Sequence, residues 1–245
     1  MKQFGLIGYP LSHSFSKKYF SEKFEKASIT DAQYELYELK SLQDFKNWMN
    51  TISNLKGLNV TIPYKQEVIP FLDQLNEKAK AIGAVNVIKK ELDGTYTGYN
   101  SDYYGFKNSL EDFLDKPFPK KALVLGTGGA SKAVIVALQD MGIDYRYVSR
   151  KTSGGILSYE DLTDELITTH QLIINTTPLG MYPGVDQCPP IPYEAIGSTH
   201  YLYDLVYNPQ ETLFMKKGLV QGAKVKNGLD MLILQAEKAW EIWNS

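Results

Sequence analysis

Lys65 and Asp102 are the charged residues whose types and positions are best suited to catalysis in this chain. Lys65 comes just after the apolar run 57–62, at the end of which an open α/β sheet would bind a ligand. Asp102 follows the turn-forming residues 98–101. An ammonium group can stabilise and protonate a carbonyl oxygen, and a carboxylate can orient that ammonium group. The pair would suit ketone reduction. Taken alone, Lys65 is more typical of a solvated surface lysine and Asp102 of a helix N-cap.

A glycine-rich turn follows the apolar run 122–125. Gly126 allows a tight turn, and Gly128 and Gly129 let backbone N–H groups approach a phosphate at the start of a helix. This arrangement suits the pyrophosphate of a dinucleotide. The third glycine of the general fingerprint is replaced by Ser131, so a glycine-rich turn without a ligand stays open as the alternative.

The strand after this turn ends in Arg150 and Lys151. A fold that prefers NAD normally places an acid here to accept a hydrogen bond from the ribose 2′-hydroxyl, but no acid occurs between Asp144 and Glu160. A guanidinium group and an ammonium group would instead pair with a 2′-phosphate. The sequence therefore favours NADP, with a solvated surface pair as the alternative.

Further polar side chains would suit a polyhydroxylated or carboxylated small substrate, with ordinary loop capping as the alternative. They are Ser12, Ser14, Thr61, Asn86 and Gln235. The histidines His13, His170 and His200 lack metal-ligand spacing, and Cys188 is distant from them in the sequence. We expect no metal site.

These residues need a scaffold, and two regions alternate between strand-like and helix-like segments, which predicts an α/β fold with mostly parallel sheets. In the first region the expected strands are 3–8, 34–38, 57–62 and 84–89, and the expected helices are 16–26, 42–49 and 65–72. In the second region the expected strands are 122–125, 144–149, 171–175 and 201–206, and the expected helices are 103–110, 131–141 and 230–243.

Composition narrows the class of protein. The 245 residues suit one large or two modest domains. Lys and Arg number 26 against 28 Asp and Glu, a net charge of −2 that argues against a nucleic-acid binder. The content of 43% hydrophobic and 22% charged residues argues against disorder. The chain has one cysteine and no signal-like start. It also has no apolar run near the roughly 20 residues that span a bilayer. We therefore expect a cytoplasmic protein without membrane partners.

The motifs together resemble the shikimate dehydrogenase family. The match is an ordered series over nearly the whole chain, at residues 8–14, 59–65, 83–86, 100–102, 126–130, 175–181, 204–209 and 228–236. The resemblance implies a two-domain α/β fold, with a substrate domain at residues 1–101 to which 231–245 return, and a Rossmann-like NADP domain at 102–230. It implies reversible NADPH-dependent reduction of 3-dehydroshikimate to shikimate in aromatic amino-acid biosynthesis.

The resemblance also implies a role for each matching residue. Lys65 is the catalytic acid/base and Asp102 its partner. For the substrate carboxylate the implied residues are Ser12, Ser14 and Tyr207, and for the hydroxyl edge they are Thr61, Asn86, Asp102 and Gln235. For the cofactor they are Gly126, Thr127, Gly128, Gly129 and Ala130 at the pyrophosphate, Ser149, Arg150 and Lys151 at the 2′-phosphate, and Leu205 and Gly228 at the nicotinamide.

Some positions depart from the family pattern. Ser149 and Lys151 replace Asn and Thr, Leu213 stands where Pro is common, and the segment 151–170 is short. Two alternatives stay open: a quinate/shikimate dehydrogenase that uses NAD, and a catalytically silent NADP-binding regulatory module. The expected oligomeric state is a monomer or a homodimer.

Overall fold

The computed structural model describes residues 1–11, 14–152 and 154–245 and has two compact units. The first comprises Met1–Ser101 with Ala236–Ser245, and the second comprises Asp102–Gln235. Each unit contains one six-stranded sheet and helices packed on it. This confirms the predicted α/β class, with one sheet in each half of the chain.

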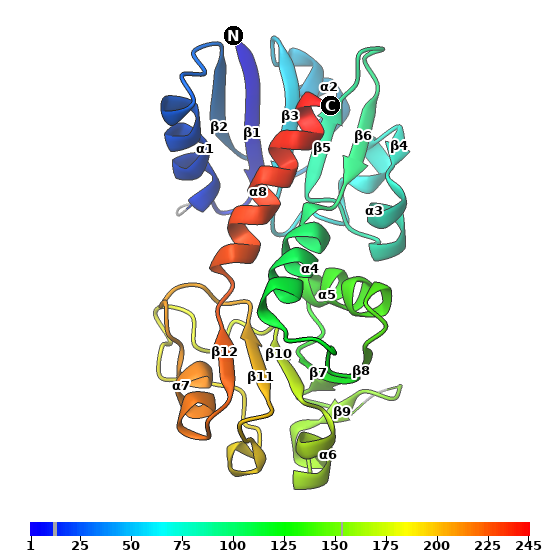
Figure 1. Ribbon diagram of the computed structural model, residues 1–245. Coiled ribbons are helices and arrows are strands. Elements are labelled where there is room, and N and C mark those ends of the chain that lie inside the picture. Colours follow the sequence, from blue (N-terminus) through cyan, green and yellow to red (C-terminus); the bar gives the residue numbers. More distant parts are fainter. Residues whose placement is uncertain (12–13, 153) are drawn as a thin grey trace. The chain divides into compact units, whose positions relative to one another are not determined.

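The sheet of the first unit is mixed (Figure 1). Its strands are β1 (Lys2–Gly8), β2 (Ala32–Glu38), β3 (Leu55–Val60), β4 (Gln74–Leu75), β5 (Val87–Lys90) and β6 (Tyr96–Tyr99). The order is β2-β1-β3-β5-β6-β4. Strand β1 pairs in parallel with β2 and β3, whereas β5 runs antiparallel to both β3 and β6. The start of β5 therefore lies at the same sheet edge as the carboxyl ends of β1 and β3.

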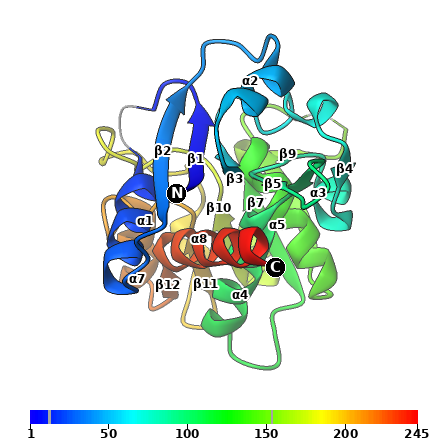
Figure 2. The same ribbon diagram turned by 90° about the horizontal axis from the view of Figure 1, so that it is seen from above.

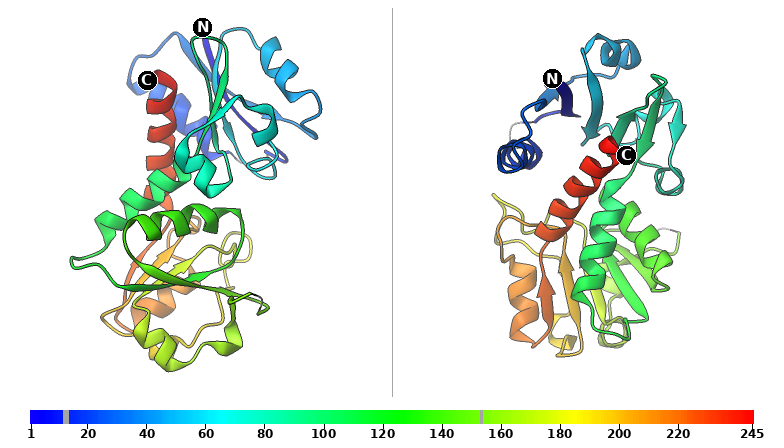
Figure 3. Two further views of the ribbon diagram at one scale, coloured as in Figure 1. Left: turned by 90° about the vertical axis from the view of Figure 1, so that its right-hand side faces the viewer. Right: turned by 45° about the horizontal axis from the view of Figure 1, so that its top comes forward.

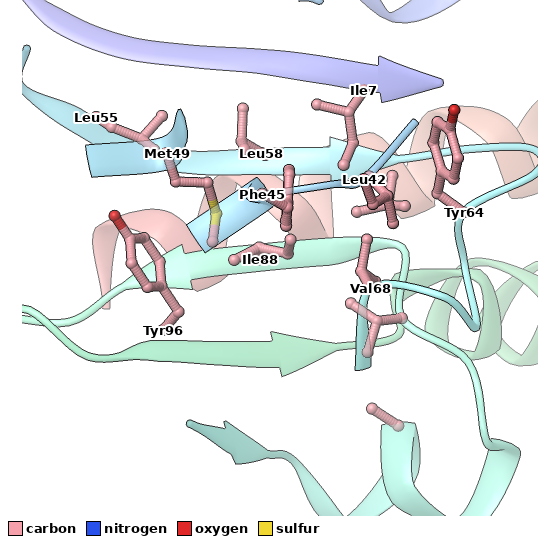
Figure 4. Packing of buried hydrophobic residues seen from close by; sticks show 13 residues of the cluster. Ile7, Leu42, Phe45, Met49, Leu55, Leu58, Tyr64, Val68, Ile88 and Tyr96 are labelled. Carbon is pink, nitrogen blue, oxygen red and sulfur yellow. The ribbon is translucent and has the colours of Figure 1, made fainter. Parts of the chain in front are cut away.

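Helices cover both faces of this sheet (Figure 2). On one face, α1 (Phe15–Lys26) and the last residues of α8 (Leu229–Asn244) form a cluster with β1 and β2 that is rich in aromatic side chains. On the other face, α2 (Phe45–Thr51) packs Phe45 and Met49 against Leu58 and Ile88 (Figure 4). The short helix α3 (Glu77–Ile82) adds Ala79 to this second cluster.

The helix expected at 65–72 is a wrong prediction. The chain forms turns there, followed by the 3₁₀-helix η1 (Ile69–Phe71). Pro70 explains the difference, because proline lacks the N–H that a continuous α-helix needs and disfavours α-helical geometry at the residue before it.

The sheet of the second unit is wholly parallel. Its strands are β7 (Lys121–Leu125), β8 (Asp144–Ser149), β9 (Leu157–Ser158), β10 (Leu172–Asn175), β11 (Tyr201–Asp204) and β12 (Lys224–Lys226). Their order is β12-β11-β10-β7-β8-β9, so the chain progresses outward in opposite directions from β7 and β10. Open α/β sheets bind ligands outside the carboxyl ends of the strands at such a switch point.

Helices also flank the second sheet (Figure 3). On one side lie α4 (Ser101–Phe113) and α5 (Gly129–Asp140), and the ring of Phe106 on α4 meets Tyr203 of β11 at a centroid distance of 5.2 Å. On the other side, α6 (Asp164–Thr169) and α7 (Leu213–Val220) contribute Ile167 and Phe214 to a separate core cluster. Two further 3₁₀-helices, η2 (Tyr159–Asp161) and η3 (Tyr193–Ala195), complete the unit. In the part of the chain that the structure describes, no helix is both long and apolar enough to cross a bilayer.

Candidate active site

Thr61, Lys65 and Asn86 gather at one edge of the first sheet. Thr61 and Lys65 follow the carboxyl end of β3, and Asn86 precedes β5, which is antiparallel to β3. The backbone N–H of Val85 donates to the carbonyl oxygen of Lys65 at 2.7 Å, which fixes Lys65 beside the segment that carries Asn86. Three of the residues expected to act on the substrate are thus neighbours within one unit.

The expected carboxylate-binding serines lie after β1. Ser14 is the N-cap of α1, where its hydroxyl accepts a hydrogen bond from the N–H of Lys17 at 3.4 Å. Because β1 and β3 are parallel neighbours, this segment starts from the same sheet edge as Thr61 and Lys65. Ser12 lies outside the described residues.

Asn86 holds the chain immediately before Asp102. Its Oδ1 accepts from the N–H of Ser101 at 2.6 Å, and its Nδ2 donates to the Ser101 hydroxyl at 3.0 Å. One residue earlier, the amide of Asn100 donates to the carbonyl oxygen of Ala84 at 3.0 Å. All three polar side chains are buried, so the segment that leads into Asp102 is fixed by hydrogen bonds away from water.

Asp102 itself is buried in the first turn of α4, within the second unit. It shares a helix face with Gly105, three residues further on. A Cβ on Gly105 would lie 2.5 Å from the carbonyl oxygen of Met231 and 2.9 Å from the N–H nitrogen of Gln235. The glycine therefore lets α4 approach α8 closely on the face that carries Asp102, beside Gln235. Tyr207 is exposed, three residues beyond β11.

A cavity of about 910 Å³ lies in the second unit, around the carboxyl ends of β7, β8 and β10. Five residues expected to bind the cofactor line it: Gly126, Thr127, Gly128, Ser149 and Arg150. A second cavity of about 620 Å³ is lined by both Arg150 and Lys151. The structure thus brings the glycine-rich turn and the end of β8 to one connected region.

The glycine-rich turn fits a pyrophosphate. Gly126 has a φ of +102°, and a Cβ there would lie 2.9 Å from Oγ1 of Thr176. In contrast, a Cβ on Gly128 or Gly129 would meet no heavy atom within 4 Å, so the space before α5 is open. The first N–H groups of a helix lack partners within the helix and attract anions. This turn could hold a pyrophosphate against its backbone.

A buried hydrogen-bond network holds Thr177, which lines the large cavity. Asn175, at the end of β10, accepts from the N–H of Thr177 at 3.0 Å and donates to Asp204 at 2.9 Å. Asp204 also accepts from the hydroxyl of Thr212 at 2.6 Å and the N–H of Val206 at 3.0 Å. Burial of the carboxyl group raises the pKa of Asp204 to about 6, despite these donors.

Sequence patterns alone assign no role to several residues that line the large cavity. Besides Thr176 and Thr177, they include Tyr159 after β9, Cys188 in the loop after β10, and Lys217 on α7. The motif 175–181 after a strand was a usable signal for the first two. The others reach the cavity from distant segments, and only the fold brings them together. Ala130 belongs to α5, and Gly228 lies beside Leu205, with its N–H bonded to the carbonyl oxygen of Val206 at 3.2 Å.

The described histidines have structural partners. His170 and His200 are buried, and a ring nitrogen of each lies 2.8 Å and 3.1 Å from the backbone carbonyl oxygens of Leu166 and Ile167, respectively. Among the residues described, no group of three or more His, Cys, Asp or Glu side chains could hold a metal ion.

Comparison with known proteins shows which family this chain resembles. A family model described as the shikimate dehydrogenase substrate binding domain matches residues 6–88. The shikimate dehydrogenase (NADP(+)) of Clostridium beijerinckii is 43% identical over an alignment of 255 positions. The alignment covers 99% of this chain and 92% of the relative.

Solved structures share the fold over the same extent. Shikimate 5-dehydrogenase from Thermus thermophilus, in complex with NADP(H) and shikimate, is 28% identical, with a TM-score of 0.84 and coverage of 99% of this chain and 93% of that one. Quinate dehydrogenase from Corynebacterium glutamicum, in complex with NAD, has a TM-score of 0.88 and the same coverage. At 24% identity, this second structure is evidence for the fold alone.

The parallel sheet with a glycine-rich turn at its switch point defines a Rossmann-type dinucleotide-binding fold. The relative that is 43% identical over almost the full length narrows this class further. The chain belongs to the shikimate dehydrogenase family.

Proposed function

We propose that this protein is an NADP-dependent shikimate dehydrogenase, which reversibly reduces 3-dehydroshikimate to shikimate in aromatic amino-acid biosynthesis. The observation that carries the proposal is the sheet edge of the first unit, where Thr61, Lys65 and Asn86 gather beside the segment held before Asp102. The full-length similarity to shikimate dehydrogenases supports the substrate, and the cavity with Arg150 supports the cofactor.

We assign the acid/base role to Lys65. NADPH, when bound, supplies the hydride for the substrate carbonyl carbon. The Lys65 ammonium group donates a proton to the carbonyl oxygen, so that the oxygen becomes a hydroxyl. The Asp102 carboxylate orients that ammonium group and accepts a hydrogen bond from a substrate hydroxyl. Asn86 positions Asp102 through its two hydrogen bonds to Ser101.

We assign the first compact unit to the substrate and the second to the cofactor. In the first, Ser12 and Ser14 bind the substrate carboxylate and Thr61 contacts the hydroxyl edge. Tyr207 supports the carboxylate and Gln235 the hydroxyl edge. The cofactor is held by Gly126 to Ala130 at the pyrophosphate, by Ser149, Arg150 and Lys151 at the 2′-phosphate, and by Leu205 and Gly228 at the nicotinamide. We further propose that the protein is a cytoplasmic monomer or homodimer.

Initial rates of cofactor reduction test this function. One purified sample is assayed with shikimate and with quinate, each with NADP and with NAD. Fast turnover only with shikimate and NADP is the expected result. Comparable rates with quinate or NAD would favour the dual-specificity alternative, against which Arg150 argues because an acid normally recognises the free ribose. No turnover with any pair would favour the silent NADP-binding module.

A further inference from the structure

Tyr159 lies where the two cavities of the second unit meet. The residues that line both cavities are Arg150, Tyr159 and Pro190. Strand β9 pairs in parallel with β8, and Ser158 is the register partner of Ser149. Tyr159 and Arg150 therefore leave the sheet side by side at its carboxyl edge.

The fold holds the Tyr159 ring firmly at this edge. Ser158 and Asp161 form a capping box, in which the Asp161 carboxylate accepts from the N–H and the hydroxyl of Ser158 at 2.7 and 2.8 Å. This fixes the start of η2, whose first residue is Tyr159. The ring packs against the core cluster beneath it and is only half-buried, so the rest of the ring is available to the cavities.

Electrostatics also places Arg150 close to this ring. Burial raises the pKa of the Tyr159 hydroxyl, and the positive charge of Arg150 acts in the opposite direction. A guanidinium group beside an aromatic ring provides two flat surfaces on which a purine base can stack. The neighbouring carboxylate of Glu160 lines the smaller cavity and would repel a further anion there, whereas it does not repel a neutral base.

Covalent connectivity points to the same ligand group. In NADP the 2′-phosphate and the adenine are attached to adjacent carbons of one ribose. If Arg150 and Lys151 bind the phosphate, the base must lie within a few ångströms of them. Tyr159 is the aromatic residue that lines both cavities there.

We propose that Tyr159 is an adenine-binding residue, on whose ring the base of the cofactor stacks. The inference rests on the proposed NADP-dependent function. It adds Tyr159, which the pairing of β9 with β8 brings beside Arg150. The contact is made by the ring face and not by the hydroxyl. Stacking of this kind predicts a loss of affinity of about 5-fold to 100-fold when the ring is removed.

Calorimetric titration of the full chain with two cofactor fragments tests the proposal. Adenosine 2′,5′-bisphosphate contains the base and the 2′-phosphate, and adenosine 5′-diphosphate lacks the 2′-phosphate. We expect Tyr159→Ala to weaken both ligands by the same factor, so that the ratio of their Kd values is unchanged. Tyr159→Phe should bind both like the wild type. Arg150→Ala should instead weaken the bisphosphate more than the diphosphate, which lowers the ratio of the diphosphate Kd to the bisphosphate Kd.

Further variants make each outcome decisive. Tyr159→Leu keeps apolar volume on the core without an aromatic face and serves if the alanine variant does not fold. Tyr145→Ala removes another partly buried tyrosine of the same unit and should leave both affinities unchanged. Wild-type affinities in Tyr159→Ala or Tyr159→Leu would overturn the adenine contact. So would a Tyr159→Phe variant that loses affinity for the bisphosphate alone, since this would assign the contact to the hydroxyl.

The same titration separates this inference from the proposed function. A wild-type chain that binds neither fragment would contradict both. Binding by the wild type that is unaffected at Tyr159 would contradict only the stacking contact.

Discussion

Gly228 lies directly against the backbone of Leu205. A Cβ added to Gly228 would overlap the carbonyl oxygen of Leu205 and come within 3.1 Å of its Cα. Gly228 is the residue before α8, and its N–H donates to the carbonyl oxygen of Val206 at 3.2 Å. Only glycine allows α8 to begin this close to the segment that follows β11.

Gly228→Ala should therefore destabilise the protein by about 1–3 kcal/mol, the usual range for overpacking. We also expect weaker NADP binding, because Leu205 must move. Urea unfolding and calorimetric titration measure the two effects. Gly197→Ala is the matched control, since a Cβ there meets no heavy atom within 4 Å. Equal stability of the two variants would contradict the expected collision.

Lys65→Ala should lower kcat for shikimate oxidation by at least about 100-fold, as expected when a general acid/base is removed. The KM for shikimate should change much less. Steady-state kinetics at saturating NADP measure both parameters. Lys56→Ala, which removes an exposed lysine from β3, is the control. A change confined to KM would show that Lys65 helps only to bind the substrate.

Arg150→Ala should reduce kcat/KM for NADP by about 10-fold to 100-fold, the range for a lost hydrogen bond to a charged group. The value for NAD should change little, because NAD has no 2′-phosphate. Arg146→Ala removes another exposed arginine, from within β8, and should affect neither cofactor. Equal losses with both cofactors would argue against a 2′-phosphate contact.

Asp204→Asn should change how stability depends on pH. The pKa of Asp204 is about 6 in the folded protein, above its ordinary value of 3.8. Between these values the folded state holds a proton that the unfolded state releases, so the group's stabilising contribution is largest below pH 3.8 and is lost as pH rises through about 6.

Urea unfolding of both proteins from about pH 4 to about pH 7.5 measures this contribution. The wild type should lose stability relative to Asp204→Asn as pH rises, with a slope of up to about 1.4 kcal/mol per pH unit. Asp144→Asn, at an exposed position on β8, should run parallel to the wild type. A constant difference between the wild type and Asp204→Asn would contradict the raised pKa.

The apolar strands of the second unit were predictable within a residue or two. Buried parallel strands form short apolar runs, and β7 and β10 began one residue away from their expected positions. The expected strand 144–149 agrees with β8. The hairpin of β5 and β6 was harder to foresee, because its polar and apolar residues do not alternate regularly and its antiparallel pairing depends on β3.

In the candidate site, too, residues with a local sequence signal were predictable and residues placed by strand pairing were not. The glycine-rich turn and Arg150 have local signatures that a sequence displays directly. Tyr159 has no such signature. Its place beside Arg150 depends on the pairing of β9 with β8, and β9 has only two residues, too few to recognise as a strand in the sequence. The link from Asn175 to Asp204 is likewise a product of strand pairing.

The first compact unit is built from two distant stretches of the chain, and this affects the order in which the chain folds during synthesis. Its aromatic cluster combines Phe4 and Phe20 with Ala239 and Trp243, from opposite ends of the numbered sequence. The ribosome therefore completes all of Asp102–Gln235 before the last members of that cluster exist. The second unit can assemble from one continuous stretch. In the first unit, α1 can cover its part of the apolar sheet face early, whereas the part that α8 covers stays exposed until translation has passed residue 243.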